Sequence, residues 1–126
     1  MITVRIDGIV PCLKDTLTGE NMYTEAVRVT RESLLSRFNE NAGWQTDWAS
    51  LLEDCEVYAL VLGGTMSIQG MIAMRKDNKA GAAEIAWMCA APENTPEISG
   101  HKKYIGVGAQ LFSIAAGKSA AYGFSE

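Results

Sequence analysis

The sequence predicts an α+β fold, similar to an α/β sandwich, in which helices flank a central antiparallel meander of a mixed sheet. Three largely apolar segments, at 56–62, 66–75 and 82–91, follow one another with only short turns between them. That order is typical of neighbouring antiparallel strands. Apolar residues at helical spacing precede the first segment and follow the last. We therefore expect a single domain over residues 1–126, with helices packed on the sheet.

Composition narrows the class of protein. Of the 126 residues, 48% are apolar and the mean hydropathy is close to zero, which suits a folded soluble domain. The formal net charge of −4 and the lack of a Lys/Arg block argue against a nucleic-acid partner. The chain has neither a run of roughly 18 apolar residues nor a signal peptide. We expect a cytoplasmic protein without a membrane partner.

The cysteines and the histidine predict no metal site. Cys12, Cys55 and Cys89 are an odd number without paired spacing, and they lie in or beside apolar segments. We expect buried free thiols in a reducing compartment. His101 is the single histidine and no C-x-x-C is present, so a metal centre has too few ligands. We expect His101 on the surface of a loop.

The first 24 residues are expected to form a hairpin or an extension ahead of a core at 25–124. Residues 2–6 alternate apolar and polar side chains, as a strand does, and Asp7-Gly8 offers a turn. Pro11 interrupts the next apolar run, which favours an edge strand or irregular chain. Residues 15–21 form a polar turn.

Two short helices are expected between the first core strand, at 25–30, and the meander. Thr30 is the candidate cap of the first helix, whose apolar face is Leu34, Leu35 and Phe38. This helix is expected to end at residues 41–43. Thr46 is the candidate cap of the second, with Trp48, Leu51 and Leu52 at helical spacing. Trp44 and Trp48 are expected in the core.

Glycines mark a predicted turn and a predicted irregularity in the meander. Gly63-Gly64 predicts a hairpin turn, and Gly70 predicts a bulge or a close backbone approach within its strand. Residues 76–79 form the next turn, and Pro92 ends the third strand. A polar loop at 93–102 follows.

The last predicted element is a helix from Val107 to Tyr122. Leu111, Ile114 and Ala115, with Ala121 or Tyr122, are expected to form its buried face. Gly123 resembles a C-cap, and Phe124 the first residue of another strand.

Between the third strand of the meander and this helix lies a Gly loop, defined as residues 103–109. Gly106 and Gly108 sit two apart at the start of the helix. Unpaired amides and the helix dipole at such a place can hold a phosphate group. An ordinary helix start that happens to contain glycine is the alternative, because a short glycine pair is a weak signal.

The order of elements and the Gly loop together resemble the GNAT superfamily of acyl-CoA-dependent N-acetyltransferases. The family's pyrophosphate loop reads Gln/Arg-x-x-Gly-x-Gly/Ala, and here Lys103-x-x-Gly106-x-Gly108 takes its positions. The run Ala83 to Ala90 is similar to the family's fourth strand, and Ala90-Ala91-Pro92 stands where members often carry Val-x-Pro. Residues 69–73 look like its third strand. The resemblance covers roughly 25–124, so the family's last helix and strands would be missing.

The resemblance implies an acetyl-CoA site and an amine acceptor, either a small molecule or a peptide. Amides from Ile105 through Gly106, Val107 and Gly108 to Ala109 would bind the cofactor pyrophosphate. Lys103 and Tyr104 would lie beside it, and the backbone at Ala90 would follow the pantetheine arm. Glu84 is the candidate base, because some members with a similar Ala-Glu-Ile run carry a catalytic Glu there. A solvent-facing strand residue is the alternative for Glu84, and a buried structural thiol is favoured over a nucleophile for Cys89.

Two readings of the function remain open. One is an N-acetyltransferase domain with little or no activity in this 126-residue form, because its acceptor side would be incomplete. The other is a non-enzymatic interaction module or a homodimer that uses an open sheet edge, since unpaired edges attract other chains.

Overall fold

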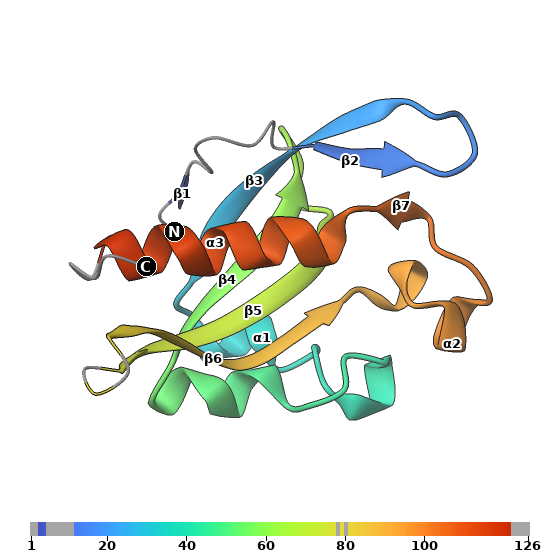
Figure 1. Cartoon of the computed structure of the whole chain (residues 1–126). Helices are drawn as coiled ribbons and strands as arrows, with labels where there is room; N and C mark the ends of the chain where they lie inside the picture. The colour runs from blue at the N-terminus through green and yellow to red at the C-terminus, as the bar shows by residue number, and fades with distance from the viewer. Residues whose placement is uncertain (1–2, 5–11, 78, 80, 122–126) are drawn as a thin grey trace.

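The structure is a computed structural model that describes residues 3–4, 12–77, 79 and 81–121 (Figure 1). Within these residues seven strands form one sheet. The strands are β1 (Thr3–Val4), β2 (Cys12–Asp15), β3 (Asn21–Val29), β4 (Glu56–Leu62), β5 (Ile68–Asp77), β6 (Ala82–Ala90) and β7 (Tyr104–Ile105). The helices are α1 (Glu32–Leu35), α2 (Pro96–Ser99) and α3 (Val107–Ala121), and the 3-10 segments are η1 (Glu40–Ala42), η2 (Trp48–Glu53) and η3 (Pro92–Asn94).

The sheet has the order β6-β5-β4-β3-β2-β7, with β1 paired beside β3. The α+β class and the antiparallel meander β4-β5-β6 are therefore confirmed. Every pairing among the described strands is antiparallel. The expected mixed sheet is to that extent wrong, because no described strand returns by a crossover to a parallel neighbour.

The meander carries two bulges. Between β4 and β5 the register passes from Leu60↔Gly70 to Val61↔Ile68, so Gln69 is the extra residue. Between β5 and β6 it passes from Ala73↔Trp87 to Met74↔Ile85, so Ala86 is extra. The prediction of a bulge near Gly70 is confirmed. Bulges bend a strand and re-aim its side chains.

Strand β3 begins earlier than the sequence predicts. It starts at Asn21, within the residues expected to form a polar turn, because Asn21, Met22 and Tyr23 pair with β2 in a hairpin. Pairing with a partner strand overrides their low strand propensity. This hairpin joins β2 directly to the core sheet. The strand expected at 2–6 is described only at Thr3–Val4, and the turn at Asp7-Gly8 and Pro11 lie outside the described residues.

Helices cover both faces of the sheet, as expected. Helix α3 lies across one face, and α1 and η2 lie on the other (Figure 1). The core beneath α3 includes Leu60, Ile72, Leu111 and Ile114. The opposite core is built around Trp48, which is fully buried, with Trp44 beside it. The two tryptophans are core residues, as predicted.

The two helices before the meander are shorter than the sequence predicts. Helix α1 is one turn, and its N-cap position is Arg31 rather than Thr30. The second segment is the 3-10 helix η2, which Asp47 caps instead of Thr46. The Asp47 carboxylate accepts a hydrogen bond from the Ala49 amide at 3.2 Å. An aspartate caps as well as a threonine, so composition alone misplaces the start by one residue.

Helix α3 begins at Val107 as predicted and buries Leu111, Ile114 and Ala115. Lys118 ties it to the sheet through an ion pair with Glu56 at 3.0 Å. Burial by itself lowers the pKa of Lys118, but its bonds to Glu56 and Tyr58 outweigh that effect and leave the pKa raised. The expected C-cap at Gly123 and strand at Phe124 lie outside the described residues. None of the described helices is long and apolar enough to span a bilayer.

Candidate functional site

A cavity of about 380 Å³ lies between the end of β6 and the first turn of α3. It is lined by Gln45, Met88, Cys89, Ala90, Asn94, Thr95, Pro96, Glu97, Lys102, Gly108 and Leu111. The site therefore brings together Ala90 and Gly108, which are 18 positions apart in the chain and are both predicted from the sequence to bind a cofactor. The cavity is concave and combines an apolar floor with polar walls, as small-molecule sites do.

The cavity lies where β6 and β7, which follow one another in the chain, pair with different strands of the sheet. Strand β6 pairs with β5, whereas β7 pairs with β2 at the other end of the sheet order. Residues 91–103, with η3 and α2, bridge the two strands, and the N-terminus of α3 follows β7 (Figure 1). The start of a helix is thereby placed beside the end of a strand that it does not continue.

The first turn of α3 supplies hydrogen-bond donors. The helix ladder begins with the Gln110 amide, which donates to the Gly106 carbonyl at 3.1 Å. Amides that precede this point, at Val107, Gly108 and Ala109, have no acceptor within their own helix. A β-carbon added at Gly108 would meet no described atom within 4 Å, so a ligand can approach the backbone there. Gly106 has a φ of +106°, which favours glycine.

The outer edge of β6 supplies further backbone groups. The Ala91 amide donates to the Gln69 carbonyl of β5 at 2.8 Å. Alternate residues of an antiparallel strand direct their backbone groups to opposite sides. The N–H and C=O groups of Ala90 and Met88 therefore face away from β5, on the side where both residues line the cavity. The Ala90 carbonyl there accepts a long hydrogen bond, of 3.5 Å, from the Thr95 hydroxyl.

The remaining residues of the Gly loop have three kinds of surroundings: the core, the β7 ladder and solvent. The Tyr104 amide donates to the Asn94 side chain at 2.9 Å, its ring is buried in the core, and it does not line the cavity, so its place beside the cofactor stays a prediction. Ile105 pairs with Lys14, and the Val107 side chain is buried. Lys103 and Ala109 are exposed but do not line the cavity.

Glu84 lies at the other end of β6 from the cavity. Its Oε1 accepts hydrogen bonds from Arg75 Nη2 at 2.7 Å and from Arg75 Nε at 3.1 Å. Arg75 also pairs with Asp54 at 2.7 Å. Glu84 lies six positions before Ala90 on the strand, a span of about 20 Å. The structure therefore does not bring Glu84 to the cavity, and its role as a base stays a prediction.

Sequence reasoning missed the residues that the loop at 91–103 brings to the cavity. Asn94, Thr95, Glu97 and Lys102 all line it, although the segment was expected to be only a polar loop. The cluster of Asn, Thr and Pro was the available signal, since such residues organise tight turns. Gln45, also at the cavity, has a positive φ of 69°, a conformation that non-glycine residues adopt at a cost.

Cys89 lies at the cavity wall as a buried thiol, as expected, whereas Cys12 and Cys55 are half-buried. Burial raises the pKa of Cys89 to about 12. At neutral pH that leaves much less thiolate than an ordinary cysteine has, and the thiolate is the reactive form. Cys89 is therefore an inert wall residue.

We expect iodoacetamide at pH 8 to alkylate Cys12 and Cys55 in the native protein and to spare Cys89. Peptide mass spectrometry would measure the three sites, with protein in denaturant as the control in which all three react. Rapid native alkylation of Cys89 would contradict the burial on which this expectation rests.

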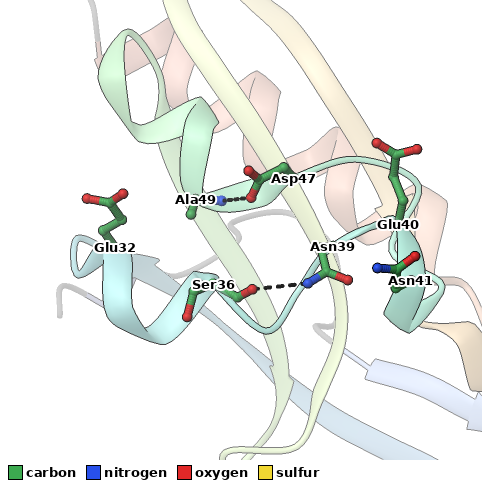
Figure 2. A pocket seen from close by; sticks show the side chains of 7 residues that line it. All are labelled: Glu32, Ser36, Asn39, Glu40, Asn41, Asp47 and Ala49. Carbon is green, nitrogen blue, oxygen red and sulfur yellow. Dashed lines mark hydrogen bonds between the residues drawn. The ribbon is translucent and has the colours of Figure 1, made fainter.

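A second cavity, of about 510 Å³, lies between α1 and the η1–η2 segment, and Figure 2 shows its side chains. Asn39 accepts a bond from the Ala42 amide and donates one to the Ser36 carbonyl, and Asp47 caps η2. These polar groups serve the local helix ends. The carboxylates of Glu32, Glu40 and Asp47 line this cavity without a lysine or arginine among the described residues around it, and they would oppose a phosphate or other anion. Glu97 at the first cavity is instead accompanied by Lys102. The cavity at β6 and α3 is the better candidate.

The first cavity offers helix amides, one lysine and the backbone groups of a strand edge to a ligand. Helix amides and Lys102 suit an anion, and the β6 edge suits a chain that carries amide groups. Comparison of the chain with protein-family models, with curated proteins and with solved structures finds no match.

Proposed function

We propose that this chain is a GNAT-like N-acetyltransferase domain that binds acetyl-CoA and directs its acetyl group to an amine. The observation that carries the proposal is the cavity in which the free edge of β6 meets the amides of α3. It follows an antiparallel meander, as the resemblance in the sequence requires. A glycine with open space above it stands at the point where a pyrophosphate would lie.

The residues around the cavity suit the parts of that cofactor. Amides of Gly108 and Ala109 would bind the pyrophosphate, with the ammonium group of Lys102 close by. Backbone groups of Met88 and Ala90 would pair with the amides of the pantetheine arm, as an added strand would. Acetyl-CoA supplies the activated acyl group, and an amine must lose its proton before it can accept that group.

The proposal predicts that acetyl-CoA binds the protein and that Gly108→Val weakens binding by about tenfold or more, because the side chain fills the approach to the amides. Isothermal titration calorimetry would measure both affinities. Gly117→Val is the matched control: Gly117 lies on the same helix, also with no described atom within 4 Å of an added β-carbon. Its affinity should equal that of the wild type.

Two outcomes would overturn this assignment. One is a wild-type protein that does not bind acetyl-CoA at millimolar concentration. The other is equal affinity in the Gly108 and Gly117 variants, which would mean that the ligand does not approach α3.

A second candidate is an interaction module that pairs through β6. Within the described residues β6 is bonded to a strand on one side only, and Trp87 on it is 40% exposed. Free edges and exposed tryptophans favour association with another chain, including a second copy. Sedimentation velocity would decide, since a monomer at high concentration would count against a homodimer.

A further inference from the structure

A buried polar network connects the two walls of the cavity. Asn94 and Gln69 are 3% and 1% exposed. Asn94 Nδ2 donates to Gln69 Oε1 at 2.9 Å and to the Gln69 carbonyl at 3.2 Å. Asn94 Oδ1 accepts the Tyr104 amide at 2.9 Å. Buried polar groups that satisfy one another in this way hold a single geometry, because any displacement leaves one of them unpaired.

Each partner of Asn94 belongs to a different part of the site. Gln69 is the bulged residue of β5, and its carbonyl also accepts the Ala91 amide, which fixes the end of β6. Tyr104 opens β7 and stands two residues before Gly106. One asparagine side chain therefore couples the bulge and the β6 wall on one side to the chain that leads into α3 on the other.

The bulge explains why the side chain of Gln69 is free to bond with Asn94 across the cavity walls. In a regular strand each residue is matched by one across the ladder, whereas the register between β4 and β5 leaves Gln69 without a cross-strand partner. Gln69 Nε2 donates to Ser67 Oγ at 3.0 Å, which orients its Oε1. That oxygen is then directed at Asn94.

We propose that Asn94 is a positioning residue that sets the distance between the β6 edge and the α3 amides, and thereby the affinity for a ligand that must reach both. The inference rests on the proposed function, since CoA is such a ligand. Pantetheine, which lacks the pyrophosphate, would need only the β6 edge. Asn94 would act through Tyr104 and Gly106 without touching the ligand's reacting atoms.

Binding of CoA and of pantetheine to three variants tests the proposal. Asn94→Leu, close in volume but without polar atoms, should lose about tenfold or more in CoA affinity and leave pantetheine affinity within about twofold. Asn94→Asp keeps the acceptor for the Tyr104 amide but places a buried carboxylate oxygen against two Gln69 oxygens, so its CoA affinity should fall as well. Val29→Ala, a buried valine on the opposite face of the sheet, should lower the Tm without changing the ratio of the two affinities. Equal losses for both ligands in Asn94→Leu, or a changed ratio in Val29→Ala, would overturn the proposal.

Hydrogen exchange separates a failure of this inference from a failure of the proposed function. Without any ligand, Asn94→Leu should speed amide exchange at residues 104–109 by about tenfold or more, with exchange in β4 unchanged. If CoA does not bind the wild type, the proposed function fails and exchange alone decides whether Asn94 positions this segment. Unchanged exchange at 104–109 would refute the positioning role, whatever the ligand result.

Discussion

Replacing Gly70 by alanine is expected to lower the free energy of unfolding by about 1–3 kcal/mol, the usual cost of overpacking a core. A β-carbon there would stand 2.7 Å from Val107 Cγ1 and 3.2 Å from Leu111 Cδ1. It would also stand 3.1 Å from the Cys89 carbonyl oxygen, which belongs to the neighbouring strand and cannot turn away as a side chain can. The helix or the strand must therefore move.

The same substitution is expected to disturb the cavity, because Val107 and Leu111 belong to the first turns of α3. Urea denaturation would measure the loss of stability, and acetyl-CoA titration the loss of binding. Gly117→Ala is the matched control: it is exposed on the same helix and should gain up to about 1 kcal/mol from helix propensity. A Gly70→Ala protein as stable as the wild type would show that α3 does not approach β5 as closely as described.

The strands of the meander could be predicted from the sequence because local patterns determine them. Strand β4 has the predicted bounds, and β6 ends one residue before the predicted end. Strand β5 begins and ends two residues later than predicted, so Lys76 and Asp77 belong to the strand and not to the expected turn. A short apolar run between turn residues carries all the information needed. Helix α3 was equally predictable from the sequence, since Leu111, Ile114 and Ala115 form one face of a helix wherever the rest of the chain lies.

The start of β3 and the short helices depended on information that a local pattern lacks. Asn21 and Tyr23 extend because β2 folds back on them, and β2 is visible only once the hairpin is known. Thr30 and Asp47 show the limit for helix starts. Asp47 caps η2 through a side-chain bond, whereas Arg31 at the start of α1 makes no such bond, so capping chemistry alone does not locate both starts.

The residues of the candidate site also fall into those that a local pattern predicts and those that it does not. Ala90 and Gly108 were predictable, because a strand end and a glycine at a helix start are local features that the resemblance joined. The environment of Tyr104 was not predictable, because its amide bonds to Asn94, ten residues earlier in a loop without periodicity. The hydrogen bond from Asn94 to Gln69 joins residues 25 positions apart, and no pattern in the sequence predicts it.

The largest effect on activity is expected from Glu84→Gln, which should lower kcat for acetyl transfer by about 10²–10⁴, the usual contribution of a general base. On the proposed function, pantetheine would run along β6 from Ala90 toward Glu84, so the acyl end and the phosphate end lie at opposite ends of one strand. Glutamine keeps the shape of the side chain but accepts no proton. A thiol-release assay over a panel of amines would measure kcat.

The ion pairs around Glu84 supply the control for this experiment. Arg75 bridges Glu84 and Asp54, and all three side chains are well exposed, so solvent screening leaves either pair with little effect on stability. Asp54→Asn removes the second carboxylate from Arg75 and should leave both kcat and the Tm close to wild type. Acetyl-CoA affinity should be unchanged in either variant, because neither residue lines the cavity. Full activity in Glu84→Gln would assign Glu84 to the surface ion pair alone, and an equal loss in both variants would make Arg75 the group that matters.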